Sequence, residues 1–298
     1  MEAFEGAMTW LIVGASGQLG KSLCAELQDR NIAYVEWNRI DGSILDFEFV
    51  SKHVARIRPK VLVNAAAWTD VDGAESNEDE AELINAGVVG FLAAAAKNVN
   101  AVLIQISTDY VFSGITSKPW DEQSEKSPVS AYGRGKAKGE DLALESYSEG
   151  TYIFRTAWLY SQYGKNFAKT MARLAFKDSE IVRVVDDQIG QPTFAGDLAN
   201  QIIDSVQKEI PFGIYHATNS GVANWFDFAK TIFELGNQDL NRVIGVTSAE
   251  YPRPAIRPKY SVLGHDAWKK TGVDEMRDWK AALSEAMPAI IKSVRMEE

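Results

Sequence analysis

Cysteine is nearly absent from this chain of 298 residues, which contains only Cys24. A lone cysteine excludes an intrachain disulfide and is typical of proteins in a reducing compartment, so we expect a cytoplasmic location. Histidine is also rare, and His53, His216 and His265 lie far apart in the sequence. Because no spacing among them resembles a zinc site, we expect structural or surface roles for all three and no bound metal.

Long apolar runs are missing as well. No stretch approaches the ~20 apolar residues that span a bilayer, so a membrane is not an expected partner. The segment Met1–Thr9 carries Glu2 and Glu5 instead of a basic flank, which is not the pattern of a signal peptide. Either Met8 is an alternative start, or residues 1–8 are the remnant of a longer or fused chain.

Positive charge is scarce, with 31 Lys and Arg against 41 Asp and Glu and a net charge of -10. Binding to nucleic acid or to an anionic membrane surface needs a positive footprint, so neither is expected. An anionic substrate would instead need a local cluster of Arg or Lys. The hydrophobic fraction of 46% is ordinary for a globular protein, and the length suits one large α/β domain with at most a small satellite.

Short apolar runs alternate with helical patterns through the first half of the chain. Residues 10–13 are all apolar, as in a buried parallel strand, and Leu19, Leu23 and Leu27 follow at the spacing of a helical stripe. The same alternation predicts strands at 33–37, 61–63, 101–107 and 151–155, and helices at 47–58, 79–98 and 132–146. This order predicts an α/β fold with a doubly wound, Rossmann-like parallel sheet and right-handed crossovers.

The alternation loosens after about residue 160. Prolines at 252, 254 and 258 mark a loop near the C-terminus. Helices are expected at 166–176, 197–207, 224–235 and 279–291, and strands at 181–185 and 213–216. We therefore divide the chain into a larger domain at 9–160, to which segments of the second half return, and a smaller C-terminal lobe at 161–298.

Three glycines follow the first predicted strand directly, in Gly14-Ala15-Ser16-Gly17-Gln18-Leu19-Gly20. Glycine lets the backbone approach a pyrophosphate, and the N-terminus of the next helix offers unpaired N–H groups. A plain turn that needs positive φ is the alternative interpretation. The spacing is GxxGxxG, not GxGxxG, but its place after a strand favours a dinucleotide site. We expect 9–160 to bind NAD(P), with Gly14, Gly17, Gln18, Leu19 and Gly20 at the cofactor.

The second predicted strand ends in Trp37-Asn38-Arg39, without an acidic residue at its tip. NAD-binding domains usually place Asp or Glu there for the ribose 2′-hydroxyl. Arg39 would instead pair with a 2′-phosphate, so Asn38 and Arg39 favour NADPH. A solvated surface arginine is the alternative, and Asp41 lies close enough to keep NADH open.

Tyr132 and Lys136 are four residues apart and share a face if their segment is helical. A nearby ammonium is expected to lower the pKa of the tyrosine from ~10 toward working pH. Such a tyrosine can protonate the alkoxide that forms when hydride reaches a carbonyl. Thr108 ends the fourth predicted strand, at the edge where ligands bind, and can hydrogen-bond the same oxygen. Its alternative role is a turn cap.

These motifs resemble the extended short-chain dehydrogenase/reductases and, within them, the dTDP-4-dehydrorhamnose reductases. The resemblance extends over most of the chain and ends near Tyr251-Pro252 and Arg257-Pro258. The matching segments are Gly14–Gly20, Val63–Ala67, Ser107–Phe112, Tyr132–Glu140, Arg155–Trp158, Asn166-Phe167 and Asp187–Thr193.

The resemblance implies an NAD(P)H-dependent oxidoreductase that reduces the C4 keto group of dTDP-6-deoxy-L-lyxo-4-hexulose to dTDP-L-rhamnose. The implied partners are this dTDP-sugar and, if the chain self-associates, a second copy in a homodimer. Thr108, Tyr132 and Lys136 would be catalytic. The implied cofactor contacts are Asp46 near the adenine, with Asn64, Ala65, Ala66, Tyr132 and Lys136 along the rest. The implied substrate contacts are Thr69, Tyr110 and Trp158 at the sugar and Arg257 at the diphosphate, although aromatic residues beside strands are usually core.

Two positions depart from the family pattern. Ala157 stands where many members have serine, which removes a hydrogen bond and leaves the sugar less defined. Some members bind Mg²⁺ through glutamates at a dimer interface, but Ser22 lies near the expected acidic position. We therefore do not carry a metal site over to this chain.

Two alternative functions stay open. A nucleotide-sugar 4-epimerase or 4,6-dehydratase would share the fold, but related dehydratases follow the catalytic threonine with Asp-Glu, whereas Asp109-Tyr110 follows Thr108 here. An epimerase would hold NAD tightly, which the missing acid after Asn38 disfavours. A non-catalytic regulatory subunit, like the β subunit of methionine adenosyltransferase, is the second alternative.

Overall fold

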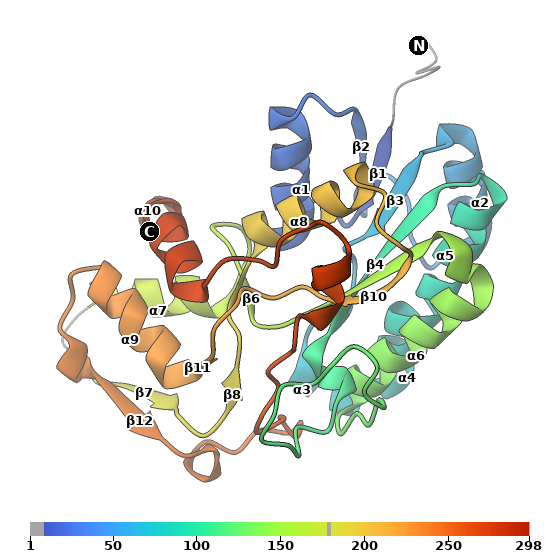
Figure 1. The fold of residues 1–298 in the computed structure, drawn as a ribbon. Coiled ribbons are helices and arrows are strands. Elements are labelled where there is room, and N and C mark those ends of the chain that lie inside the picture. Colours follow the sequence, from blue (N-terminus) through green and yellow to red (C-terminus); the bar gives the residue numbers. More distant parts are fainter. Residues whose placement is uncertain (1–8, 178–179, 298) are drawn as a thin grey trace.

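A six-stranded sheet forms the centre of the computed structural model, which describes residues 9–177 and 180–297. Met8 and the rest of 1–8 lie outside the described residues. The strand order is β10-β5-β4-β3-β1-β2, and every neighbouring pair is parallel (Figure 1). The strands are β1 (Trp10–Val13), β2 (Tyr34–Trp37), β3 (Val61–Asn64), β4 (Val102–Thr108), β5 (Thr151–Thr156) and β10 (Gly213–His216). The predicted doubly wound parallel sheet is confirmed.

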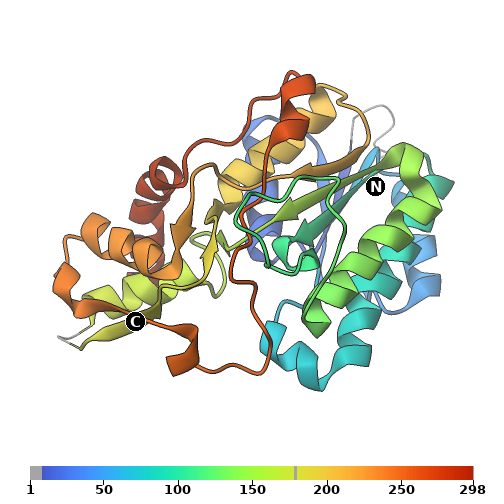
Figure 2. The ribbon, with the colours of Figure 1, turned by 60° about the horizontal axis from the view of Figure 1, so that its bottom comes forward.

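Helices cover both faces of this sheet, as Figures 1 and 2 show. Alternate residues of a strand point to opposite faces, so Trp10 and Ile12 of β1 join one core cluster while Leu11 and Val13 join another. The first cluster packs under α1 (Gln18–Asp29) and α8 (Ala195–Gln207), and the second under α2 (Phe47–Ile57), α5 (Val88–Asn98) and α6 (Ala131–Tyr147). All of β1 is buried, which explains its continuous apolar run.

The chain changes direction across the sheet at β1. From β1 it passes to β2 on one side, and β3 then lies on the other side of β1. Ligands of open parallel sheets bind outside the carboxyl ends of the strands at such a switch point. The turns that follow β1 and β3 are therefore the expected place for a ligand.

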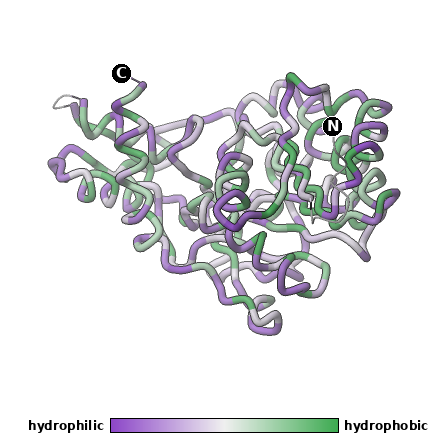
Figure 3. The backbone as a smooth tube through the Cα atoms, turned by 90° about the horizontal axis from the view of Figure 1, so that it is seen from above, coloured by the Kyte–Doolittle hydropathy of each residue, from purple (hydrophilic) through white to green (hydrophobic). Residues whose placement is uncertain are grey.

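A second group of helices packs beside the sheet around its own apolar cluster (Figure 1). It contains α7 (Phe167–Phe176), α9 (Trp225–Leu235) and α10 (Trp279–Met296). Hydrophobic and hydrophilic residues are interspersed along the backbone in all parts of the molecule (Figure 3). None of the helices in the described part of the chain is long and apolar enough to cross a membrane.

Short strands connect this group to the sheet, and most of them were not predicted. The pairs are β6 (Leu159–Tyr160) with β9 (Thr193–Phe194), β8 (Ile189–Gly190) with β11 (Ala223–Asn224), and β7 (Val182–Val185) with β12 (Val243–Val246). Only β7 was expected. A strand of two residues shows no alternation, and its partner comes from a distant part of the chain, so the sequence pattern carries no trace of it.

The predicted single helix over 79–98 is wrong in one respect. The structure has α4 (Glu78–Glu82), a π-helical turn at Leu83–Gly87 and then α5, and an unpredicted α3 (Val71–Ser76) comes before them. The π-helical turn holds the buried Asn85, whose side chain accepts from the Trp68 N–H (2.9 Å) and donates to the Trp68 carbonyl (3.0 Å). A π-helical turn with such a bond often marks a functional site.

Candidate active site

The glycine turn after β1 leaves no room for side chains. Gly14 has a φ of +78°, and a Cβ atom on it would lie 2.9 Å from the backbone nitrogen of Ala66. A Cβ atom on Gly20 would overlap the Gly14 carbonyl. Gly17 is the N-cap residue of α1, which starts at Gln18 and Leu19. Since glycine has no side chain, no side-chain cap covers the first N–H groups of this helix. This bare backbone at a helix N-terminus and switch point fits a dinucleotide pyrophosphate.

The tip of β2 lies beside this turn. The Ser16 N–H donates to Asn38 Oδ1 (2.7 Å), and the Asn38 N–H donates to Asp41 Oδ2 (2.8 Å). Asp41 therefore uses one carboxylate oxygen on its own turn. Arg39 is exposed and forms no ion pair with any residue in 9–177 or 180–297. Asp46 is also exposed and caps α2 by accepting from the Phe49 N–H (3.0 Å).

The end of β3 borders the same turn on its other side. Asn64 is buried, donates to Gln105 Oε1 (2.9 Å) and accepts from the Ala66 N–H (3.2 Å). The Ala65 N–H donates to the Val13 carbonyl of β1 (3.0 Å), so the two strand ends are joined. Thr69 lies further along the same segment and is exposed.

Thr108, Tyr132 and Lys136 meet at the carboxyl end of β4. Thr108 is the last residue of β4, and Ser130 caps α6 by accepting from the Gly133 N–H (3.1 Å), which starts this helix just before Tyr132. The Tyr132 side chain lies close enough to Thr108 for the threonine hydroxyl to affect the pKa of the phenol. The Lys136 ammonium, 4% exposed, donates to the Ile106 carbonyl of β4 (2.6 Å).

The expected effect of Lys136 on Tyr132 is absent. Burial raises the pKa of Tyr132 to about 12, and only the nearby Thr108 hydroxyl works in the opposite direction. Burial also lowers the pKa of Lys136 to about 8, partly opposed by Glu140. The prediction that Lys136 lowers the Tyr132 pKa is therefore wrong for this form of the protein, because desolvation outweighs the charge of an ammonium that is bonded to the Ile106 carbonyl. Tyr132 is a phenol that keeps its proton.

A buried ion pair ties α6 to β4 and β5. Arg155 of β5 donates two hydrogen bonds to Glu140 of α6 (2.9 and 2.7 Å), and the Ser107 hydroxyl donates to the same carboxylate (2.5 Å). Glu140 lies one helical turn after Lys136, and Ser107 lies one residue before Thr108. The pair thus fixes the helix that carries Tyr132 and Lys136 against the strand that carries Thr108.

Asp109 lies under Thr108 and is 1% exposed. The Thr108 hydroxyl donates to Asp109 Oδ1 (3.0 Å) and accepts from the Tyr110 N–H (3.2 Å). Burial raises the pKa of the Asp109 carboxyl to about 6, although the nearby hydroxyls of Ser261 and Thr108 oppose the shift. The Tyr110 ring meets the Tyr132 ring edge to face, with centroids 5.6 Å apart. Tyr110 therefore borders Tyr132.

Arg257 is held by an acidic partner that the sequence did not indicate. Its guanidinium donates to both carboxylate oxygens of Asp72 in α3 (2.9 Å each), and Asp72 also accepts from the Ala255 N–H (3.2 Å). The two residues are 185 positions apart. The loop of prolines thus docks on α3, and Arg257 is not a free cation in this form.

A family profile described as "RmlD substrate binding domain" matches residues 8–291. The chain belongs to this family.

Named relatives cover nearly the whole length of this family member. The chain is 44% identical to a dTDP-4-dehydrorhamnose reductase of Streptomyces griseus, over 94% of this chain and 93% of the relative. It is 42% identical to a dTDP-4-keto-6-deoxy-D-glucose reductase of Streptomyces niveus, over 94% and 97%. A crystal structure of dTDP-4-dehydrorhamnose reductase from Bacillus anthracis in complex with NADP superposes with a TM-score of 0.91, at 38% identity over 95% of this chain and 99% of that one. These relatives differ in the sugar that they are named for.

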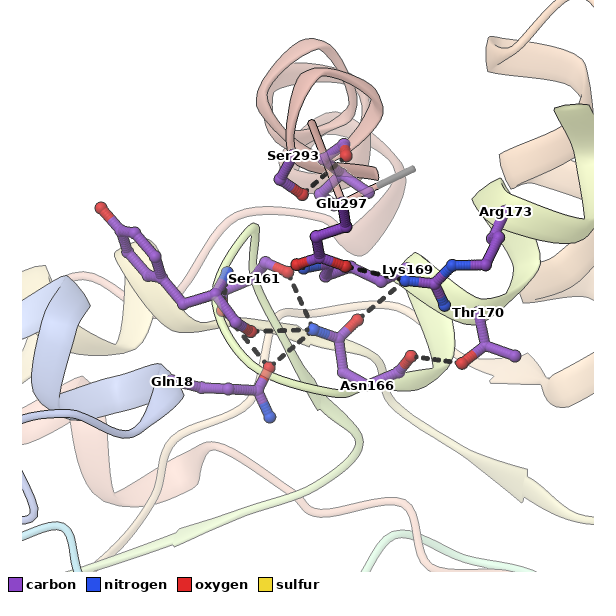
Figure 4. A network of polar contacts seen from close by, with 10 residues as sticks. Gln18, Ser161, Asn166, Lys169, Thr170, Arg173, Ser293 and Glu297 are labelled. Atoms are coloured by element: carbon purple, nitrogen blue, oxygen red, sulfur yellow. Dashed lines mark hydrogen bonds and ion pairs between the residues drawn. The ribbon is translucent and has the colours of Figure 1, made fainter. Parts of the chain in front are cut away.

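Gln18 joins the glycine turn of this RmlD-family chain to the second group of helices (Figure 4). Its Oε1 atom accepts from the Asn166 side chain (2.9 Å), which also donates to the Ser161 carbonyl (2.8 Å). Asn166 in turn caps α7 by accepting from the Lys169 N–H (2.9 Å). The Oε1 atom of Gln18 is therefore committed to this contact.

Ser22, at the position where some family members have an acidic residue, forms a hydrogen bond within its own helix. The Ser22 hydroxyl donates to the Gln18 carbonyl (3.1 Å). Within 9–177 and 180–297, no group of three or more His, Cys, Asp or Glu side chains is arranged to hold a metal ion.

Several residues of this site were missed from the sequence. Asp72, Asn85 and Trp225 act through side chains that reach segments far away in the chain. None belongs to a short motif, so no local spacing could have indicated them.

Proposed function

We propose that the chain reduces the C4 keto group of dTDP-6-deoxy-L-lyxo-4-hexulose to dTDP-L-rhamnose with NADPH. The observation that carries the proposal is the placement of Tyr132, a buried tyrosine that keeps its proton, beside Thr108 and Lys136 at the carboxyl edge of β4. Reduction of a ketone needs a proton donor for the new alkoxide. Family membership and relatives named as reductases of dTDP-4-keto sugars support the same reaction.

The glycine turn and its neighbours would hold the cofactor. Its pyrophosphate would lie on the backbone of Gly14, Gly17, Gln18, Leu19 and Gly20, in a turn that leaves no room for a side chain at Gly14 and Gly20. When bound, the reduced nicotinamide supplies the hydride for C4. The remaining proposed contacts are Asn38 and Arg39 at the ribose phosphate, Asp46 at the adenine, and Asn64, Ala65, Ala66, Tyr132 and Lys136 toward the nicotinamide.

The side chains at β4 handle the proton. The Tyr132 hydroxyl donates its proton to O4 as C4 accepts hydride and the carbonyl oxygen becomes an alkoxide. Thr108 orients the same oxygen, and its own hydroxyl is oriented by Asp109. Lys136 would bind the nicotinamide ribose, and its ammonium would stabilise the phenolate that Tyr132 becomes.

Substrate recognition is assigned to four residues. Thr69, Tyr110 and Trp158 are proposed at the sugar, and Arg257 at the diphosphate. Because Arg257 already holds a carboxylate with both nitrogens, its geometry suits an anion with two oxygens. A substrate diphosphate would replace Asp72 as its partner.

The alternatives predict different behaviour. A 4,6-dehydratase needs a second acid after Asp109, where this chain has Tyr110. A 4-epimerase would return its cofactor to the starting redox state in each cycle. A regulatory subunit in the manner of the methionine adenosyltransferase β subunit would bind a nucleotide without consuming it.

One assay separates these functions. Purified protein is given NADPH and dTDP-4-keto-6-deoxyglucose, with and without a 3,5-epimerase, and NADPH absorbance is followed. Stoichiometric oxidation that requires the epimerase supports the proposed reaction. Oxidation without it would assign the un-epimerised sugar, as in the relative named for that substrate. No oxidation with either sugar would reject a reductase.

Two expectations about the protein as a whole stay predictions. The single Cys24 is free and buried, which fits the cytoplasmic location proposed from the sequence. Self-association as a homodimer is the second, and its size in solution would test it.

A further inference from the structure

Trp158 adopts an unusual backbone conformation where the chain leaves the parallel sheet. Its φ is +46°, in the left-handed region that a bulky side chain rarely adopts. Such strain persists only where the surroundings over-determine it. The contacts of Trp158 are therefore the place to look for what imposes this conformation.

Two residues in or directly after the β8–β11 ribbon lie against the Trp158 indole. Its ring stacks on that of Trp225, with centroids 3.7 Å apart and planes at 12°. A Cβ atom on Gly190 would lie 2.7 Å from Cζ2 of the same indole. Gly190 pairs with Ala223 between β8 and β11, and Trp225 follows β11 directly as the first residue of α9. The β8–β11 ribbon thus brings both contacts to Trp158.

Trp225 is itself held by the second group of helices. Its ring lies 4.6 Å from that of Phe167 in α7, and Asn224 caps α9 by accepting from the Asp227 N–H (2.7 Å). Trp158, by contrast, follows β5 of the central sheet. The stacked pair therefore transmits the position of α9 to a residue at the end of the sheet.

The pair lies close to the proposed chemistry. The Cβ position of Gly190 is 3.0 Å from the Ser261 hydroxyl, and Ser261 lies near enough to Asp109 to lower the pKa of its carboxyl. Asp109 Oδ1 accepts a hydrogen bond from the Thr108 hydroxyl. A continuous set of contacts therefore leads from Trp158 to the residue that orients the reacting oxygen.

We propose that Trp225 is a positioning residue that sets sugar specificity by holding the Trp158 indole against the substrate. This inference rests on the proposed function, which places Trp158 at the sugar. An aromatic ring offers a flat apolar surface to the C–H face and methyl group of a deoxy sugar. The stack on Trp225 and the bare backbone of Gly190 fix where that surface lies.

Kinetics test the proposal with two variants that disturb Trp158 from different segments. Trp225→Leu removes the stack, and Gly190→Ala adds a methyl group against the indole. Each should raise KM for the sugar about 2- to 10-fold, the size of one aromatic pair. The NADPH Kd should stay within about twofold in both variants. kcat should do so in Trp225→Leu, because Trp225 touches neither the groups that handle the proton nor the cofactor turn. Each variant should also change the ratio of kcat/KM between the two 4-keto sugars.

Phe226→Leu is the matched control. Phe226 is the next residue of α9, also partly buried, and its ring contact is with Lys230 and not with Trp158. This variant should keep the wild-type KM. The double variant Trp158→Leu/Trp225→Leu should have the KM of Trp158→Leu alone, since Trp225 acts through Trp158. Unchanged KM in Trp225→Leu, or full additivity in the double variant, would overturn the proposal.

A spectroscopic readout does not depend on turnover. Two stacked indoles give an exciton-coupled signal in far-ultraviolet circular dichroism. Trp158→Phe and Trp225→Phe should each abolish it, Phe226→Leu should keep it, and added dTDP-sugar should alter it whereas NADPH should not. If the wild-type protein shows no turnover of either 4-keto sugar, the proposed reaction is rejected. A signal that survives Trp225→Phe, or does not respond to the sugar nucleotide, would reject the role of Trp225.

Discussion

At the scale of single residues, burial shifts the pKa values of Tyr132 and Lys136 in opposite directions. It raises the pKa of Tyr132 to about 12 and lowers that of Lys136 to about 8, because desolvation disfavours the charged form of either group. Near neutral pH, Tyr132 is thus a proton donor with its proton in place. Lys136 is charged below pH 8 and loses its charge above it.

Removing the Tyr132 hydroxyl tests the proton donor. Tyr132→Phe should lower kcat by about 10²–10⁴-fold, the usual contribution of a positioned general acid. The NADPH Kd and the thermal midpoint should change little, because the ring and its contact with Tyr110 remain. Near wild-type kcat in this variant would refute the mechanism.

The charge of Lys136 should appear in the pH profile. If the ammonium stabilises the forming phenolate, kcat/KM should fall as pH rises through about 8, where Lys136 deprotonates in the free enzyme. Lys136→Met should remove this inflection, lower kcat and weaken NADPH binding. The profile of kcat/KM between pH 6 and 10 checks it, and an unchanged inflection in the variant would assign the pKa to another group.

Arg39 decides the cofactor preference in the same local way. Arg39→Ala should raise the NADPH Kd about tenfold or more and leave the NADH Kd nearly unchanged, since a hydrogen bond to a charged group contributes about 1.5–3 kcal/mol. Fluorescence titration with both cofactors measures the two constants. Equal losses for NADPH and NADH would remove Arg39 from the 2′-phosphate site.

At the scale of elements, the clearest contact is that between α3 and the loop of prolines. Arg257 and Asp72 form it with two hydrogen bonds, and both side chains are about a quarter exposed. The pair has two interpretations, a structural tether or a phosphate-binding arginine with a stand-in partner. Variants of the two residues separate them.

Arg257→Ala should raise KM for the dTDP-sugar about tenfold or more, with the NADPH Kd unchanged. Asp72→Asn keeps the guanidinium and removes the competing carboxylate, so KM should stay the same or fall. Initial rates against sugar concentration give both values. A similar rise in KM for both variants would mean that the pair only holds the loop in place.

Elements differed in how well the sequence predicted them. The six sheet strands and the long helices were predicted because a buried strand is continuously apolar and a helix carries a stripe of period 3.6. The strands β6, β8, β9 and β11 were not, since two residues carry no period, and the four-residue strand β12 was missed as well. The π-helical turn at Leu83–Gly87 escaped because the apolar pattern runs on through it.

For the whole molecule, a buried polar layer under the sheet edge makes stability depend on pH. His216 at the end of β10 is fully buried, bonds the Gly264 carbonyl through Nδ1 (2.9 Å) and lies 3.4 Å from Arg155. Burial, with Arg155 next in size, lowers its pKa to about 3. The folded state keeps His216 neutral at pH values where the unfolded chain protonates it.

The free energy of unfolding should therefore fall as pH drops below about 6.5. His216 is protonated there in the unfolded chain, whereas in the native state it stays neutral down to about pH 3. The loss for one such group is about 2 kcal/mol between pH 6.5 and 5. Asp109 opposes it, since its pKa of about 6 favours the protonated native form as pH falls. Urea unfolding of wild type and His216→Asn at several pH values isolates the histidine. Parallel curves for the two proteins would contradict the assignment.

The residue types and their spacing along the sequence determined the fold class and the glycine turn after β1. They also determined the position of Thr108 at a strand end and of Tyr132 and Lys136 on one helical face. These features depend on residues within a few turns of each other, so spacing and hydrophobic period suffice to predict them. Tertiary structure alone decided the pKa values of Tyr132 and Lys136, the partner of Arg257, the commitment of Gln18 to Asn166 and the stack of Trp158 on Trp225. Each depends on burial or on a side chain from a distant segment, and such contacts exist only after the chain has packed.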